Sequence, residues 1–210
     1  PRAMAVLNPL KVVITNASDE VLTQSFARHP NLPELGTRDI PFTQQIYIDA
    51  ADFSEEPPKG FKRLVLGGEV RLRHSYVIKC DEVIKNEAGE IVELRCSADL
   101  NTLGKNPEGR KVKGVIQWVS ATLGVPAEIR LYDRLFTQAD PESGESFLDC
   151  INPDAFKVTQ AIVEPSLATA QPEERFQFER EGYFVADLKD CVDGKLVFNK
   201  TVSLRDSWGG

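Results

Sequence analysis

A chain of 210 residues, of which 41% are hydrophobic, can bury one large core or two small ones, since domains commonly hold roughly 100 to 150 residues. Its formal net charge of −7 argues against a protein that coats nucleic acid without selectivity, although local basic patches remain compatible with it. No apolar run reaches the roughly 20 residues that span a bilayer. We therefore expect a soluble, cytoplasmic protein without membrane partners.

The first half of the chain predicts short strands joined by polar loops. Residues 16–42 contain three prolines and are expected to form a loop, because proline cannot continue a helix or a central strand. Runs rich in β-branched residues or with alternating polarity indicate strands. The runs at residues 76–85 and 90–98 flank Asn-Glu-Ala-Gly, which is typical of a hairpin. The expected strands are residues 10–15, 44–49, 76–85 and 90–98.

The stretch GFKRLVLGGEVRLRHSYVIKC, residues 60–80, combines a strand pattern with fixed positive charge. If residues 69–78 form one strand, alternation places His74 on the apolar face, as a core residue, and Arg71 and Arg73 on the opposite face. A short preceding strand would add Lys62 and Arg63 across a Gly-Gly turn. Guanidinium groups on a rigid strand suit phosphates and base edges, and the alternative is a solvated face whose arginines pair with acidic neighbours.

The second half continues the all-β pattern. Residues 101–113 read as a basic loop, which is a second positive cluster, and residues 112–120 as a strand that ends the first domain. The alternation in residues 127–136 is too brief to separate a strand from a short helix, and residues 152–156 suggest one helical turn. Further strands are expected at residues 157–163, 175–184 and 196–204. No stretch shows sustained helical periodicity, so we predict an all-β fold of two consecutive β-barrels, at residues 1–120 and 121–210.

Sequence motifs for catalysis are missing. The chain has no G-x-x-x-x-G-K-[ST] loop, no G-x-G-x-x-G turn and no G-x-S-x-G elbow. Its two histidines and its four cysteines, which lack CxxC spacing, indicate neither a zinc site nor a disulfide framework, and reduced thiols are expected. We identify no catalytic residue, no metal ligand and no cofactor site in this sequence.

Eight segments, taken together and in order, closely resemble bacterial glutaminyl-tRNA synthetases over essentially the whole chain. They are Pro1 to Val6, His29 to Asn31, Lys62 to Gly67, Val70 to Arg73, Lys111 to Ser120, Arg130 to Phe136, Phe176 to Phe184 and Asn199 to Trp208. The resemblance implies the C-terminal anticodon-binding region, made of a proximal and a distal β-barrel, with the C-terminal segment packing back on the proximal one. It also implies that the catalytic domain, with its ATP and Mg²⁺, lies upstream of Pro1, so that this chain is a fragment of a monomeric ligase.

Seven residues stand where that family contacts the glutamine anticodon, and the basic residues near them are expected to contact the RNA backbone. The implied anticodon residues are Arg2, Asn31, Arg63, Arg71, Arg73, Gln177 and Arg180. The backbone contacts are Lys62, Lys105, Arg110, Lys111 and Lys113. Gln177 and Arg180 lie three apart, so they can meet one ligand only if their strand ends or bulges near Glu181-Gly182. The Pro-Pro-Lys-Gly segment before Phe61 departs from the family pattern, because it lacks the polar, glutamine-bearing stretch of some relatives. The resemblance therefore does not support RNA contacts from that loop.

The implied partners are the anticodon stem-loop of glutamine tRNA and the upstream catalytic domain. Rival interpretations are a pair of protein-interaction barrels, a ribosomal-RNA-binding protein of similar barrel fold, and the related barrels of an archaeal or eukaryotic glutamyl-tRNA synthetase. Anticodon bases are unstacked on binding and are then read by fixed donors and by stacking, which suits arginines on a rigid scaffold. The negative charge elsewhere would discourage indiscriminate RNA binding.

Overall fold

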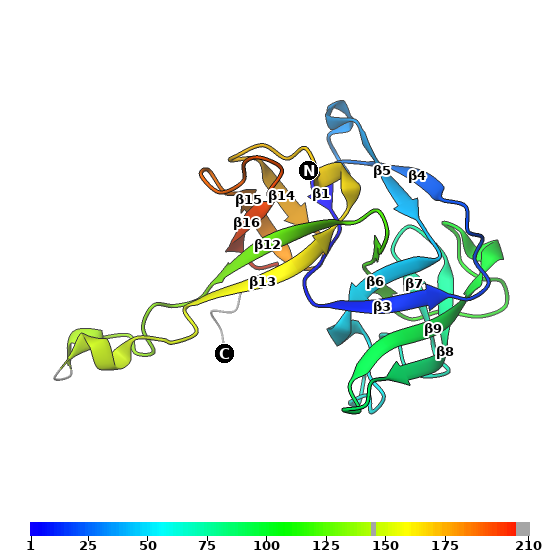
Figure 1. Cartoon of the computed structure of the whole chain (residues 1–210), viewed down its shortest axis with the longest axis horizontal. Helices are drawn as coiled ribbons and strands as arrows, with labels where there is room; N and C mark the ends of the chain where they lie inside the picture. The colour runs from blue at the N-terminus through cyan, green and yellow to red at the C-terminus, as the bar shows by residue number, and fades with distance from the viewer. Residues whose placement is uncertain (144–145, 205–210) are drawn as a thin grey trace.

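The computed structural model describes residues 1–143 and 146–204, and this part of the chain is built from strands and short 3-10 turns. Two seven-stranded sheets lie side by side (Figure 1) and curve into a nearly closed barrel and a half-barrel, which confirms the predicted all-β fold of two barrels. No helix in the described residues is long and apolar enough to cross a membrane. The 3-10 turns are η1 (Pro33–Leu35), η2 (Ala50–Asp52), η3 (Leu100–Thr102), η4 (Pro141–Ser143), η5 (Phe147–Cys150) and η6 (Pro165–Leu167).

The first sheet has the strand order β10-β7-β8-β9-β3-β6-β11. Its members are β3 (Pro9–Ile14), β6 (Gln45–Asp49), β7 (Glu69–Leu72), β8 (Val77–Lys85), β9 (Ile91–Asp99), β10 (Val115–Ile116) and β11 (Val119–Ser120). Apolar side chains alternate along these strands and fill one core, in which Trp118, Ile46 and Ile48 are fully buried. The predicted hairpin of residues 76–98 is confirmed by the pairing of β8 with β9.

The second sheet has the order β1-β14-β15-β16-β12-β13-β2. Its members are β1 (Arg2–Ala3), β2 (Ala5–Val6), β12 (Val125–Tyr132), β13 (Phe156–Val163), β14 (Arg175–Phe178), β15 (Gly182–Ala186) and β16 (Val197–Val202). Phe178 packs in its core between Phe184 and Phe198, with ring centroids 4.4 Å and 5.1 Å away. The open choice at residues 127–136 is resolved as a strand, β12.

The ends of each sheet are formed by two short strands that follow one another in the chain. Only Gln117 and Trp118 separate β10 from β11, and only Met4 separates β1 from β2. Because a segment of a few residues bonds to strands at both ends of a sheet, each sheet must curl enough to bring these ends near each other. Residues 2–6 therefore belong to the sheet of the second half of the chain, while the boundary at residue 120 stays a prediction.

The expectation of a loop at residues 16–42 is wrong. β4 (Leu22–Ala27) and β5 (Thr37–Phe42) form a two-stranded antiparallel ribbon with η1 at its tip, seen above the first sheet in Figure 1. Pro33 lies in the turn. Pro41 lies in β5, which pairs with β4 on one side and with none of the named strands on the other. Prolines are tolerated at these positions because no ladder hydrogen bond is lost there.

The stretch of residues 60–80 is a hairpin and not one continuous strand, which corrects the predicted faces. β7 ends at Leu72, whose N–H and C=O close a tight turn with Tyr76 and Ser75, and His74 has φ of 60°. Arg73 and His74 thus lie in a turn, and His74 is half-buried instead of a core residue. The expected strand at Lys62 and Arg63 is also absent, since their neighbours form only isolated bridges.

Residues 175–184 also form a hairpin, β14–β15, where one strand was expected. The strand ends at Phe178, and Arg180 and Gly182 have positive φ values of 68° and 151°. The condition under which Gln177 and Arg180 could meet one ligand, a strand that ends or bulges near Glu181-Gly182, is therefore met. At residues 152–156 the expected helical turn is a hydrogen-bonded turn between Asn152 and Ala155 at the root of β13. Residues 205–210, part of the segment expected to pack back on the first barrel, lie outside the described residues.

Candidate RNA interface

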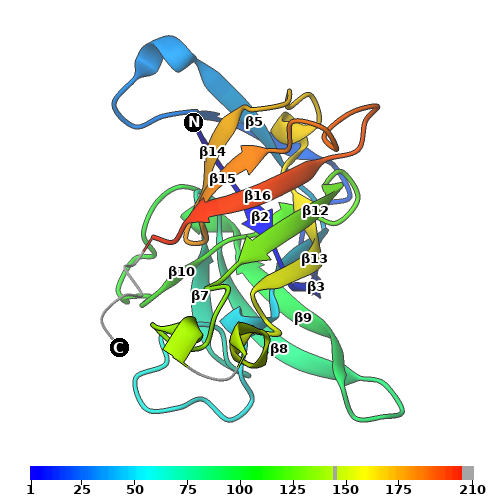
Figure 2. The same ribbon diagram turned by 90° about the vertical axis from the view of Figure 1, so that its left-hand side faces the viewer.

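Three of the predicted anticodon residues line one cavity of about 670 Å³ between the second sheet and the tip of the β4–β5 ribbon. Arg2 on β1 lies opposite Gln177 on the parallel neighbour β14, and Arg2 Nε donates a hydrogen bond to Gln177 Oε1 at 3.1 Å. Asn31, from the loop at the tip of the β4–β5 ribbon, reaches the same cavity, as do the aromatic rings of His29 and Tyr183. Figure 2 shows the ribbon extending beside β14. The cavity therefore combines amide and guanidinium groups with rings on which a base can stack.

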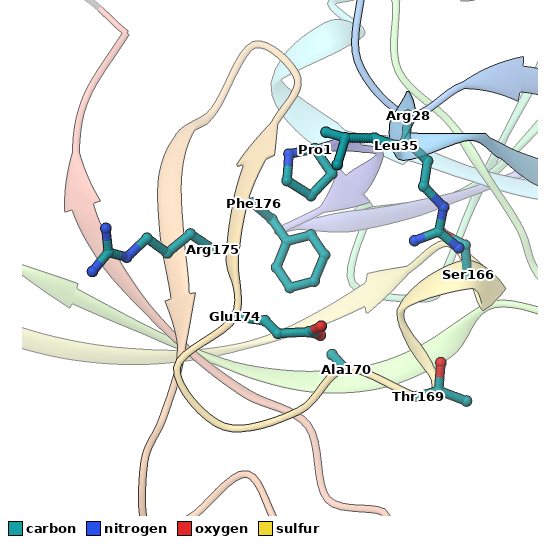
Figure 3. Close-up of a pocket in the computed structure, with 9 residues that line it drawn as sticks. All are labelled: Pro1, Arg28, Leu35, Ser166, Thr169, Ala170, Glu174, Arg175 and Phe176. Atoms are coloured by element: carbon teal, nitrogen blue, oxygen red, sulfur yellow. The ribbon is translucent and has the colours of Figure 1, made fainter. Parts of the chain in front are cut away.

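A smaller cavity of about 350 Å³ continues on the other side of Phe176 (Figure 3). The Phe176 ring faces it, with the Arg28 guanidinium to its right beside Ser166 and the Glu174 carboxylate below, whereas Arg175 points away from the other side chains. Phe176 and Pro1 contribute to both cavities. The two cavities thus flank one strand, β14.

Arg63 and Arg180 meet on one buried carboxylate, Asp52 at the end of η2. Both Nη atoms of Arg180 donate to Asp52, at 3.0 and 3.1 Å, and Arg63 Nε lies 3.0 Å from Oδ1 of the same carboxylate. Burial raises the pKa of Asp52, while the two guanidinium groups act in the opposite direction. Asp52 comes from the first barrel and Arg180 from the second, so this ion pair joins the barrels.

Arg73 pairs with Glu179, the residue before Arg180, so this contact also crosses between the barrels. Glu179 also accepts a hydrogen bond from Arg38 on β5, at 2.7 Å, and Arg38 Nε lies 2.9 Å from the buried Glu164. Burial raises the pKa of Glu164, and Arg38 opposes this shift. Arg38, Glu164 and Glu179 are all less than 5% exposed, so they form an ionic network within the interface between the barrels.

Arg71 is the predicted anticodon residue that stands apart. Its guanidinium donates to three backbone carbonyls, of Ser75, Thr102 and Lys105, and so ties the β7–β8 turn to the loop after η3. Nearby, the buried Trp118 donates its indole N–H to the carbonyl of Arg73 at 2.9 Å. These bonds hold the turn that carries Arg73 at a defined position.

His74 lies beside the arginines in the same turn. Its ring stacks on Phe26 of β4 with centroids 4.5 Å apart, and its Nε2 is 4.0 Å from Glu179. Burial lowers the pKa of His74, whereas Glu179 raises it. A non-glycine residue with positive φ is uncommon and strained, and here the stacking and the turn hydrogen bonds stabilise it.

The basic residues expected to contact the RNA backbone divide into two groups. Arg110 is neutralised by Glu69 and Asp99, with contacts of 2.9 and 2.7 Å, and these hydrogen bonds lower the pKa of Asp99. The lysines have exposed side chains and make no ion pair within the described residues; they are Lys62, Lys105, Lys111 and Lys113. The lysines therefore retain positive charge that a phosphate can meet, while Arg110 does not.

Six of the seven predicted anticodon residues gather along one segment, residues 177–180. Gln177 and Arg180 belong to it, and Arg2 and Asn31 line the same cavity as Gln177. Arg73 pairs with Glu179, and Arg63 binds the carboxylate of Asp52, which also binds Arg180. Sequence reasoning missed Asp52, Glu179, Glu164 and Arg38, because charged residues in loops are usually solvated and no local pattern indicates their burial. Among residues 1–143 and 146–204, no group of three or more metal-ligating side chains is found.

Two family models match this chain, each described as the anticodon-binding domain of class I tRNA synthetases (E and Q), over residues 1–99 and 115–187. The chain belongs to this family of anticodon-binding domains. It is 66% identical to the glutamine-tRNA ligase of Ectopseudomonas mendocina, 64% identical to that of Stutzerimonas stutzeri and 62% identical to that of Pseudomonas syringae pv. tomato. The alignments cover 99% of this chain but only 37 to 38% of those ligases, so the chain spans little more than a third of their length. The resemblance found in the sequence is confirmed.

Proposed function

We propose that this chain recognises the anticodon of glutamine tRNA on behalf of a glutamine-tRNA ligase. The observation that carries the proposal is the convergence of Arg2, Asn31 and Gln177, from three separate segments, on one cavity between the second sheet and the tip of the β4–β5 ribbon. Its volume of about 670 Å³ lies in the range of roughly 300 to 1,000 Å³ that is usual for sites binding small ligands. Single-stranded RNA is read by splaying bases into such sites.

The remaining predicted residues extend this interface. Arg63, Arg73 and Arg180 are held by buried carboxylates near the junction, and their side chains remain 42%, 29% and 27% exposed. The exposed lysines at residues 62, 105, 111 and 113 supply backbone attraction without base selectivity. In this arrangement the arginines and amides specify the sequence, and the lysines add affinity.

The ligase reaction itself belongs to sequence outside this chain. In the complete protein, ATP and Mg²⁺ serve the catalytic domain, which is the second partner of these barrels, and the enzyme acts as a cytoplasmic monomer. The relatives named above are whole ligases of which this chain matches a part. The division of labour follows, with anticodon recognition here and aminoacylation elsewhere.

The test is to titrate this chain with labelled anticodon stem-loops at several salt concentrations. We expect the glutamine stem-loop to bind more tightly than stem-loops with one anticodon base changed, by roughly 1 to 3 kcal/mol at a base that is directly read. We also expect binding to weaken steeply with salt. Gln177→Ala should remove part of the discrimination, while Gln160→Ala, an exposed change on β13 outside the cavity, should not. Equal affinity for every anticodon would refute the proposal.

A further inference from the structure

The turn between β14 and β15 forms ion pairs of both signs with residues from the first half of the chain. Glu179 pairs with Arg38 and Arg73, and the next residue, Arg180, pairs with Asp52. Two adjacent residues of opposite sign thus make crossed ion pairs with one neighbouring surface. Such a pattern defines orientation, because a slip of one residue would bring like charges together.

The single carboxylate of Asp52 binds two guanidinium groups, those of Arg63 and Arg180. Its exposure is 3%, and both of its oxygens bind Arg180. Arg180 Nη1 also donates to the Val115 carbonyl at 2.9 Å, so the second barrel is tied to backbone as well as to a side chain. Bidentate pairs of this kind fix the plane of the guanidinium as well as its position.

The same carboxylate leaves Arg63 with donors to spare. Arg63 uses Nε on Asp52 and Nη1 on the Ala51 carbonyl, both at 3.0 Å, and its Nη2 has no hydrogen-bond partner in the described part of the chain. The Arg63 side chain is 42% exposed. A guanidinium anchored by two contacts and free on one edge is prepared to donate to a base without first losing its conformational freedom.

We propose that Asp52 is a positioning residue of the anticodon interface, which fixes the free edge of Arg63 and holds the Arg180 turn against the first barrel. This inference rests on the proposed function. It assigns to a buried carboxylate, which cannot itself reach an RNA base, part of the selectivity among anticodons. The opposite role would be competition, in which Asp52 neutralises both arginines and RNA must displace it.

The experiment uses the full ligase and compares kcat/KM for glutamine tRNA with kcat/KM for tRNAs carrying one altered anticodon base. Asp52→Asn keeps the size of the side chain and removes its charge. We expect it to lower kcat/KM for the unaltered tRNA by about tenfold, and much less for the tRNA altered at the base that Arg63 reads. With Arg63→Ala the double variant should lose less than the sum of the two single losses, because both changes remove the contact between Asp52 and Arg63.

Two further variants keep the inference testable if Asp52→Asn does not fold. Asp52→Glu retains the charge but moves the carboxylate by one methylene, and should still lower the discrimination. The control is Asp187→Asn, since Asp187 also binds an arginine, Arg130, but lies in the second barrel outside both cavities. It should leave the discrimination unchanged.

The possible results distinguish a failure of the proposed function from a failure of the positioning role of Asp52. Equal use of all anticodons by the unmodified enzyme would refute the proposed function itself. Normal discrimination that persists in the Asp52 variants, an equal loss for every tRNA, or tighter tRNA binding by Asp52→Asn would refute the positioning role alone. The last of these results would indicate competition instead.

Discussion

The predicted arginines differ in what their donors already do in the free protein. Arg71 has its donors on three carbonyls, whereas Arg63 and Arg73 are held by the carboxylates of Asp52 and Glu179 and remain partly exposed. An arginine whose donors bind the backbone stabilises a loop, and one with a free edge can also read a base. The second group therefore offers the sharper test at the scale of single residues.

Arg63→Ala and Arg73→Ala in the full ligase are each expected to reduce kcat/KM for glutamine tRNA, because each removes donors from the interface. A good base contact is worth roughly 1 to 3 kcal/mol of discrimination, so the loss should be smaller for a tRNA already altered at the base concerned. The measurement is a double-mutant cycle between each protein change and each anticodon base change.

Lys111→Ala provides the comparison for these arginines. Lys111 is exposed and makes no ion pair with any described residue, so its removal should weaken binding equally for every anticodon and less so at high salt. Coupling energies near zero for both arginines, with circular dichroism unchanged, would show that they are ordinary surface charges.

At the scale of elements, the site depends on a close crossing of two loops. Gly114, with φ of 101°, precedes β10, and a Cβ placed there would lie 1.8 Å from the Lys62 carbonyl oxygen. The Gly114 carbonyl also accepts the N–H of Arg71. The segment with Lys62 and Arg63 can therefore lie against the β7–β10 edge only because residue 114 has no side chain.

Gly114→Ala is expected to destabilise the chain by about 2 to 4 kcal/mol, since both the positive φ and the steric overlap oppose a methyl group. Gly89→Ala is the matched control, because Gly89 also has positive φ, 80°, but has open space around its Cβ direction. It should cost about 1 kcal/mol. Thermal unfolding of both variants is the measurement, and equal losses would mean that the close approach contributes nothing.

At the scale of the whole molecule, the two barrels are joined by a buried ionic network and not by an apolar interface alone. Glu164 is 1% exposed, accepts the N–H of Met4 at 2.7 Å and pairs with Arg38. Its pKa is raised by burial, so its charged form depends on that partner. Removing the charge of Glu164 leaves the buried Arg38 with Glu179 as its remaining acidic partner.

Glu164→Gln is expected to lower the free energy of unfolding by about 3 kcal/mol, because breaking a buried pair from one side leaves Arg38 with less compensation. Glu93→Gln, which breaks a surface pair with Lys11 at 3.2 Å, should cost less than about 1 kcal/mol. Denaturant titration at neutral pH measures both. A loss for Glu164→Gln as small as that for Glu93→Gln would show that the network does not stabilise the interface.

The fold class and the family could be predicted from the sequence, because strand alternation and turn residues are local properties and the eight matching segments are distributed along the whole chain. The sequence did not locate the end of β14, since residues 175–184 were expected to form one strand, and only the requirement that Gln177 and Arg180 share a ligand pointed to an interruption there. It did not locate the β4–β5 ribbon, because prolines at a turn and in a strand paired on one side look like those of a loop.

Which arginines keep unpaired donors and which charges are buried depends on the packing of segments that are distant in the sequence. The turn at Arg73 and His74 reversed the chain where alternation predicted a continuous strand, since a hairpin depends on pairing between β7 and β8. Asp52 pairs with Arg180, which lies 128 positions away along the chain, and Glu179 pairs with Arg73, which lies 106 positions away. Burial and ion pairing arise from the packing of two barrels, and no local pattern in the sequence encodes such distant contacts.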